Sequence, residues 1–221
     1  MRVRSTVTLI LVLAVGLSLV ACGHDHGSSK PIVTQILSDA LYDGDIALGP
    51  SSSATYTVTQ GNSQSVFAGI DPVTLIEYRT FLDFPLGGSN GVPLDAVIDS
   101  ATLDIYINSI DPYPLSGTIP IRIDLVSFQP PYLVGTDFDR SSQPALMTKT
   151  INPPISQTDF GNHVYIDVTQ MMVEVQRLGL ADFQVRIMED LGLVSPGIIE
   201  INDTTGSNRN QLAPLLEVSY Y

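Results

Sequence analysis

The side chains in this sequence that are best suited to chemistry are carboxylates gathered in two short segments. Asp39, Asp43 and Asp45 form one group, and Asp137 and Asp139 form the other. Ca²⁺ takes about six to eight oxygen ligands, which carboxylates and backbone carbonyls supply, so the first group is a candidate structural calcium site. The alternative is that each aspartate accepts a hydrogen bond from a nearby backbone amide in an Asx turn.

The histidines show no catalytic pattern. His24 and His26 lie in a short polar segment, where two ligands make only a weak metal site. A serine hydrolase would have to use His163 as its base, but this residue opens a predicted strand, where a hydrogen-bonded role is expected. The fingerprints of metalloproteases, P-loop proteins and dinucleotide-binding proteins are missing from the sequence.

A glycosidase-like pair of carboxylates stays open as an alternative, because its two acids need only be close in space. However, 18 aspartates against 5 glutamates favour turn chemistry over a catalytic pair. We therefore predict that the chain is not an enzyme and that it uses no cofactor other than that structural calcium.

Three aromatic residues in predicted loops are candidates for ligand binding. Tyr113, Tyr132 and Phe138 are flanked by prolines, glycines and aspartates, and sugars stack on exposed aromatic rings. The alternative is that these side chains cover the edge of the core.

The first 21 residues have the layout of a secretory signal peptide. Arg2 and Arg4 supply positive charge, and residues 9–20 are almost wholly apolar but too short for a comfortable membrane span. The end of this segment, Leu19-Val20-Ala21-Cys22, resembles the lipobox of bacterial lipoproteins, in which a diacylglycerol is attached to the cysteine and the chain is cut before it. Cys22 is the only cysteine, so no intramolecular disulfide can form. An ordinary signal peptide or an uncleaved anchor, with Cys22 as a free thiol, is the alternative.

Residues 22–31 are short and polar, and they predict a flexible tether that leads to a single domain at 32–221. Gly23 stands where an inner-membrane retention signal would have an aspartate, which favours anchoring in the outer membrane with the leaflet left open. Loss of the signal peptide would change the formal net charge from −13 to −15, because Arg2 and Arg4 are removed. Such an acidic surface argues against nucleic acid and against docking on anionic lipid.

Alternation of apolar and polar residues predicts the elements that position these groups. It is clearest in residues 75–84, 101–108 and 119–126, where apolar side chains occupy nearly every second position, so each of these three strands should have one face on a core and one in water. Shorter candidate strands are 33–37, 56–59, 65–68, 164–168, 183–188, 198–201 and 215–220. About ten strands separated by glycine- and proline-rich turns predict an all-β fold, an antiparallel jelly-roll β-sandwich.

One short helix is predicted between Asp167 and Gly179. Val168, Met171, Met172, Val175 and Leu178 recur there at helical spacing, so the methionines are expected to fill the core and the helix to close one end of the sandwich. Residues 129–162 form the longest stretch without periodicity, and long irregular segments of this kind are often functional or disordered.

Four segments resemble the DNRLRE domain, also classed as carbohydrate-binding module family 96. They are residues 78–86 (YRTFLDFPL), 97–106 (VIDSATLDIY), 165–169 (YIDVT) and 213–220 (APLLEVSY). The resemblance implies a jelly-roll β-sandwich in a secreted or surface protein, and some members bind acidic polysaccharide such as alginate. The name-giving motif is not evident, residues 38–46 replace an expected Asn-x-Gly segment, and tryptophan is missing. No sugar-binding residue is therefore transferred.

Two functions follow as expectations. The first is a lipid-anchored cell-envelope protein whose non-catalytic β-sandwich binds polysaccharide or matrix. The second is a structural or assembly protein that docks an envelope protein, with the terminal strand that ends in Tyr220 and Tyr221 at a free sheet edge.

Overall fold

The computed structural model describes residues 30–50, 55–128, 132–190 and 196–221. Residues Pro31–Tyr221 form one compact unit. The expected signal peptide at 1–21, the lipidation site Cys22 and most of the expected tether at 22–31 lie outside the described residues. No helix in the described part is long and apolar enough to cross a membrane.

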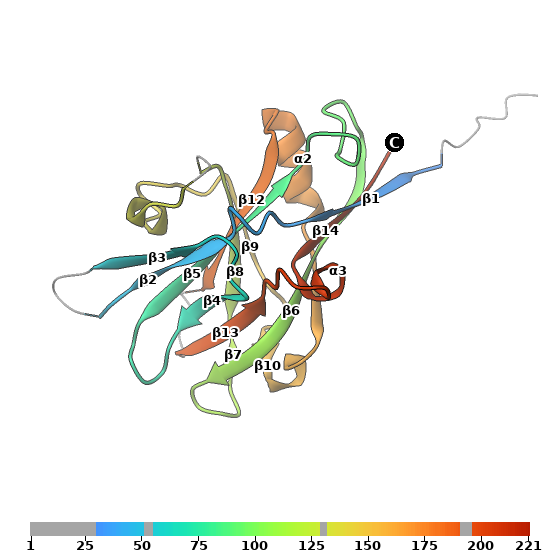
Figure 1. The fold of residues 1–221 in the computed structure, drawn as a ribbon. Coiled ribbons are helices and arrows are strands. Elements are labelled where there is room, and N and C mark those ends of the chain that lie inside the picture. The colour runs from blue at the N-terminus through green and yellow to red at the C-terminus, as the bar shows by residue number, and fades with distance from the viewer. Residues whose placement is uncertain (1–29, 51–54, 129–131, 191–195) are drawn as a thin grey trace, which may run out of the picture. The chain divides into compact units, whose positions relative to one another are not determined.

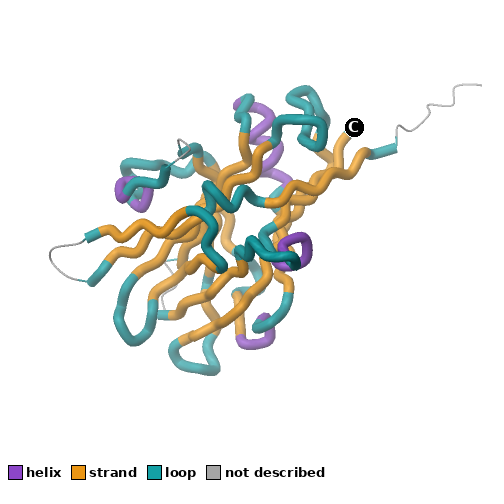
Figure 2. Tube along the Cα trace, in the orientation of Figure 1, coloured by secondary structure: helices purple, strands orange, loops and turns teal. Residues whose placement is uncertain are grey.

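Strands dominate the domain (Figures 1 and 2). Those in the described residues are β1 (Ile32–Leu37), β2 (Gly44–Leu48), β3 (Tyr56–Gln60), β4 (Ser65–Ile70), β5 (Glu77–Pro85), β6 (Ile98–Pro112), β7 (Thr118–Ile119), β8 (Ile121–Val126), β9 (Met147–Thr150), β10 (Ile155–Ser156), β11 (His163–Asp167), β12 (Asp182–Glu189), β13 (Gly197–Asn202) and β14 (Leu215–Tyr220). The helical segments are α2 (Thr169–Leu178), α3 (Arg209–Leu212) and the 3-10 turns η1 (Gly135–Phe138) and η2 (Gln157–Asp159).

The strands form a curled antiparallel sheet in the order β1-β14-β6-β13-β4-β5-β12-β8-β9. In addition β11 pairs with β6, β2 pairs with β5, and β3 pairs with β2, while β7 and β10 make a separate short ribbon. The long strand β6 joins the two halves, because its first part pairs with β14 and β11 and its second part pairs with β13. The predicted all-β, sandwich-like architecture is confirmed.

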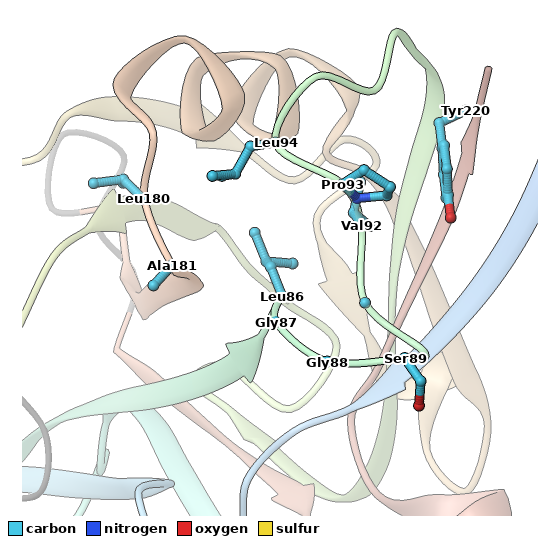
Figure 3. Close-up of a pocket in the computed structure, with 11 residues that line it drawn as sticks. Leu86, Gly87, Gly88, Ser89, Val92, Pro93, Leu94, Leu180, Ala181 and Tyr220 are labelled. Carbon is cyan, nitrogen blue, oxygen red and sulfur yellow. The ribbon is translucent and has the colours of Figure 1, made fainter.

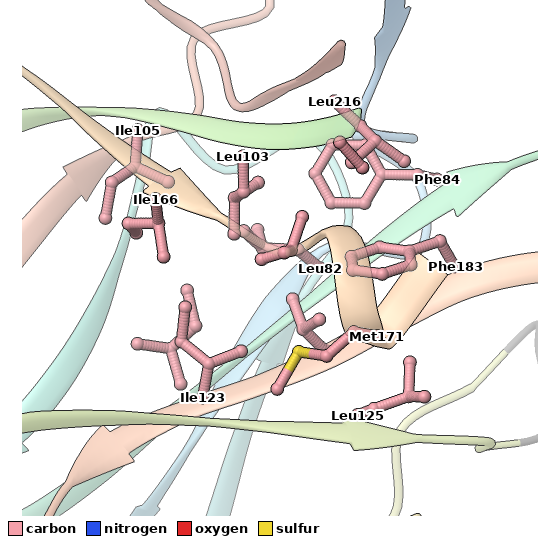
Figure 4. Packing of buried hydrophobic residues seen from close by; sticks show 14 of the residues in the cluster. Leu82, Phe84, Leu103, Ile105, Ile123, Leu125, Ile166, Met171, Phe183 and Leu216 are labelled. Atoms are coloured by element: carbon pink, nitrogen blue, oxygen red, sulfur yellow. The ribbon is translucent and has the colours of Figure 1, made fainter. Parts of the chain in front are cut away.

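The core lies between the two halves of the curled sheet. Alternation decides which side chains enter it: in β6, Leu103, Ile105 and Ile107 are buried while Thr102 and Asp104 face the other way. Figure 4 shows Leu103, Ile105, Ile166 and Leu216 from one half meeting Leu82, Phe84, Ile123, Leu125 and Phe183 from the other, with Met171 of α2 among them.

The predicted helix is confirmed as α2. The Asp167 carboxylate accepts a hydrogen bond of 3.0 Å from the backbone N–H of Thr169 at the start of the helix. Gly179 ends it in the left-handed conformation, with φ of 64°. Met171 and Met172 are buried in the core, as expected, and the helix packs against β6 and β12.

The expectation of one wet face is wrong for β5 and β8, and the neighbouring β12 is also buried on both faces. Their second faces carry Arg79, Asp83, Asp124 and Arg186, and all four side chains are buried. The chain at 132–146 covers Arg79, Asp124 and Arg186, and its backbone carbonyls accept hydrogen bonds from the buried arginines: Arg186 Nη1 donates to Asp137 O at 2.9 Å and to Gln143 O at 3.1 Å. Asp83 is covered differently, since its carboxylate accepts from Gln184 Nε2 at 2.6 Å. The segment at 129–162, which was expected to be irregular, contains η1, β9, β10 and η2. We call the buried charges Arg79, Asp124 and Arg186, together with the chain at 132–146 that covers them, the charged layer.

Candidate functional site

The three aromatic residues predicted for sugar binding do not share one environment. Tyr113 and Tyr132 are 65% and 74% exposed, whereas Phe138 is only 3% exposed. The Phe138 ring lies under the guanidinium of Arg79, whose Cζ is 3.9 Å from the ring centroid, and beside Tyr56 at 5.5 Å. Phe138 is thus a buried contact of the charged layer, and its part in an exposed stacking surface is withdrawn.

The predicted calcium ligands point at three different backbone amides. Asp39 accepts from Leu41 N at 3.0 Å, as in an Asx turn, while Asp43 and Asp45 accept from Asp83 N at 2.8 Å and Phe67 N at 3.2 Å. Asp137 and Asp139 likewise accept from the nearby amides of Val134 and Ser141. Within the described ranges, no three His, Cys, Asp or Glu side chains converge as a metal site would require.

The sequence Gly87-Gly88-Ser89-Asn90-Gly91 has the Gly-x-Ser-x-Gly spacing of a hydrolase nucleophile elbow, which the prediction of no catalytic activity did not take into account. It lies in the loop between β5 and β6 rather than in a strand-to-helix turn, and Thr34 Oγ1 of β1 donates to Asn90 O. His163 is in β11, which β14 and β6 separate from β1, a distance of about 14 Å at ordinary strand spacing. The loop therefore has the residue spacing of the motif, but His163 is not placed to act as the base for Ser89.

Its glycines instead shape an apolar hollow (Figure 3). A Cβ on Gly91 would lie 1.9 Å from Leu86 O, so only glycine allows this close approach. The hollow has a volume of about 420 Å³, and Leu86, Val92, Leu94, Leu180 and Tyr220 are among its lining residues.

A second hollow of about 300 Å³ lies beside the charged layer and is lined by Tyr56, Glu77, Arg79 and Arg140, among others. Its arginines already have partners. Arg79 Nε donates to Glu77 Oε1 at 2.8 Å, and Arg140 Nε lies 3.1 Å from Asp124 Oδ2. The charges in this hollow are balanced by one another, so it has little capacity left for an ionic ligand.

The outer face of β1, β14, β6 and β11 carries the arrangement best suited to binding a ligand from solution. Because Ile166 and Leu216 point into the core, their neighbours Tyr165 and Glu217 must point outward. The strand register places Tyr165 opposite Asp104 and Gln35 opposite Glu217. We call this surface the Tyr165 face; it consists of Gln35, Thr102, Asp104, Tyr106, His163, Tyr165, Leu215 and Glu217.

The aromatic side of this face is ordered by its own contacts. His163 Nδ1 lies 2.8 Å from Asp104 Oδ1, which confirms the hydrogen-bonded role expected for this histidine. The His163 ring stacks on Tyr165 at 6.0 Å with an interplanar angle of 14°, and it meets the edge of Tyr106 at 5.1 Å. Tyr165 is nevertheless 69% exposed, so one face of a positioned ring remains open to solvent.

Hydrogen-bonding groups surround that ring. Gln35 Nε2 donates to Glu217 Oε2 at 2.7 Å, and the same two residues line a hollow of about 220 Å³ together with Thr102, Asp104, Tyr165 and Leu215. Partial burial and the nearby Glu217 raise the pKa of Asp104, while His163 opposes the shift. The face thus offers one flat aromatic surface, two carboxylates, an amide and a hydroxyl, which are groups that can stack on a sugar ring and accept from or donate to its hydroxyls.

No protein-family model matches the chain, and no curated protein matches its sequence. The resemblance to the DNRLRE domain is therefore neither supported nor contradicted by these comparisons.

Proposed function

We propose that this chain is a lipid-anchored protein of the cell envelope whose β-sandwich is a non-catalytic module that binds polysaccharide on the Tyr165 face. The observation that carries this proposal is the open Tyr165 ring, held by His163 and bordered by Asp104, Gln35 and Glu217. The lipobox-like sequence at Cys22 supplies the anchor in this proposal, with the outer membrane as its destination.

The charge of the face favours a neutral sugar over an acidic one. Asp104 and Glu217 both line the hollow, and the chain has a formal net charge of −13. A uronate or sulfate group would be repelled by these carboxylates, whereas neutral hydroxyls donate hydrogen bonds to them. The proposed ligand therefore differs in charge from the acidic polysaccharide that the family resemblance implies.

Binding of neutral and acidic polysaccharides to the purified chain tests this proposal. The protein is prepared without its signal peptide and with Cys22→Ser, and retardation in gels containing each polysaccharide is measured. Tyr165→Ala should abolish retardation by a neutral glycan. Tyr132→Ala is the matched control, because it removes an equally exposed tyrosine from another part of the chain, and it should leave retardation unchanged.

Three outcomes would overturn the proposal. These are the absence of binding to every polysaccharide, binding that survives Tyr165→Ala, and binding that is lost with Tyr132→Ala. Release of reducing ends from the bound glycan would contradict the non-catalytic part, since Asp104 and Glu217 share the hollow as two glycosidase carboxylates would.

The second candidate function, docking of an envelope protein, needs a different strand from the one expected. The terminal strand β14 lies between β1 and β6 and is not an edge. The edge beside it is β1, whose Ile32 and Val33 side chains are exposed, and another chain could add a strand there. This alternative would be favoured if a membrane protein co-purified with the chain in a stoichiometric amount and no longer did so with the variant Val33→Pro in β1.

A further inference from the structure

The apolar hollow of Figure 3 opens among exposed apolar side chains. Leu94, which lines the hollow, and the neighbouring Val97 are both two-thirds exposed, and Ile32 and Tyr221 are about half exposed. Isolated exposed apolar residues are ordinary on protein surfaces, but several gathered at one end of a domain beside an apolar hollow indicate a contact surface.

These side chains are brought together by strand pairing. Val97 and Tyr221 exchange both backbone hydrogen bonds, at 3.1 and 3.0 Å. Ile32 is directly opposite Tyr220 across β1 and β14, so these two side chains lie on one side of this end of the sheet, where Tyr220 lines the hollow with Leu94. Val97 and Tyr221 lie on the other side of the same end, because successive side chains of a strand alternate. We call this group, Ile32, Leu94, Val97, Tyr220 and Tyr221 with the hollow, the apolar end of the domain.

We propose that the apolar end inserts into the surface of the bilayer that holds the protein, with the hollow receiving part of an acyl chain. This inference rests on the proposed anchoring at Cys22. Ile32 belongs to the first strand of the domain, ten residues after Cys22, and ten residues span at most about 36 Å. The tether therefore keeps the domain within contact distance of the lipid, and the apolar end is where the tether joins it.

The charges beside the apolar end select the kind of lipid. Asp95 and Asp99 are exposed next to Leu94 and Val97, and they would be repelled by anionic headgroups. The contact is therefore made with a zwitterionic bilayer through apolar burial, and its strength should change little with salt concentration.

The test uses two facts of composition: the chain has no tryptophan and a single cysteine. The protein without its signal peptide is coupled through Cys22 to a maleimide lipid in phosphatidylcholine vesicles, which places the domain at a membrane whether or not cells lipidate it. Leu94→Trp then provides a unique fluorophore at the rim of the hollow. Val73→Trp is the matched control, since the Val73 side chain is 85% exposed and lies in the loop between β4 and β5.

The expected result is that Leu94→Trp emission moves to shorter wavelength on coupling and is quenched by brominated acyl chains, while Val73→Trp is unaffected. A second substitution, Val97→Asp, should reverse both changes in Leu94→Trp without altering the melting temperature. Equal quenching of both tryptophans, or of neither, would overturn the inference. If the protein is a dimer without vesicles and the emission of Leu94→Trp is already at shorter wavelength, the apolar end contacts a second copy of the chain instead of the bilayer. None of these outcomes depends on lipidation in cells, so failure here is distinct from failure of the anchor.

Discussion

Asp124 and Arg186 form an ion pair of 2.8 Å in which neither side chain is exposed. The pair lies beneath the chain at 132–146, and the Asp124 carboxylate also accepts from Thr148 Oγ1 at 2.8 Å. Burial alone would raise the pKa of Asp124, but the hydrogen bonds from Arg186 and Thr148 and the nearby guanidinium charges hold it below its usual value. These two residues therefore fasten a long connecting segment to the sheet.

Asp124→Asn should destabilise the domain by about 3–5 kcal/mol, because it leaves the Arg186 charge buried without its counter-charge. Arg140→Ala removes an exposed partner of the same carboxylate and should cost about 1 kcal/mol or less. Urea unfolding monitored by circular dichroism measures both values. Equal losses for the two variants would contradict the importance assigned to the buried pair.

Because several aspartates are buried, we expect the domain to be more stable at mildly acidic pH than at neutral pH. Burial raises the pKa of Asp45 to about 6, from 3.8, despite the opposing hydrogen bond from Phe67 N–H. Burial likewise raises the pKa of Asp83 to about 6 and raises the pKa values of Asp43 and Asp203, which face each other. The folded state then binds more protons than the unfolded state between pH 3.8 and about 6, so stability falls as the pH rises through this window.

The melting temperature should accordingly be higher at about pH 5 than at about pH 7.5. Asp45→Asn keeps an acceptor for Phe67 N–H. It should add on the order of 2 kcal/mol to the free energy of unfolding at the higher pH and make the melting temperature depend less on pH. Asp95→Asn, at an exposed aspartate, is the control and should change neither quantity. A melting temperature that rises with pH across this window would show that the buried carboxyls are not protonated in the folded state.

Calcium should leave the melting temperature of the domain unchanged. Asp39, Asp43 and Asp45 are engaged by three separate amides, so ion binding would require these bonds to be exchanged. If the segment did bind calcium, a free calcium concentration of a hundred times the Kd would add about 2.7 kcal/mol to the free energy of unfolding. Thermal unfolding with calcium and with a chelator would readily detect this difference. Such a gain would return these aspartates to the role of metal ligands.

Cys22→Ser should move the protein from the membrane fraction to the soluble fraction and remove the mass of the lipid. The reason is that each buried methylene contributes about 0.8 kcal/mol to membrane attachment, and two or three acyl chains hold a protein far more firmly than one. Fractionation of cells and intact-mass measurement test this directly. Unchanged mass and distribution would refute the anchor.

Local sequence rules were sufficient for most strands and for α2, because alternation and helical spacing act over a few residues. Tyr165 was not among the predicted binding residues, although the apolar Ile166 next to it implies that its side chain points outward. Local rules failed for β2, in which Gly44 and Asp45 suggest a loop but pairing with β3 and β5 imposes a buried strand.

The surroundings of Tyr165 could not be predicted in the same way. Gln35 and Glu217 meet in its hollow although 182 residues separate them in the chain. The wet face predicted for β5 was wrong for a similar reason at Arg79, because this side chain is covered by Phe138, 59 positions later. In both cases the alternation pattern specifies the direction of a side chain but not which distant segment lies against it.

The pairing of β1 with β14 also determines when this domain can assemble. During synthesis β1 emerges before the other strands of the domain, but its neighbour in the sheet is β14, the last strand. The backbone of β1 can therefore form its sheet hydrogen bonds only after residues 215–220 have been made. If the chain is exported from its N-terminus, closure happens only after nearly the whole polypeptide has crossed the membrane. In that case the order of strands would delay completion of the sheet until translocation is almost finished.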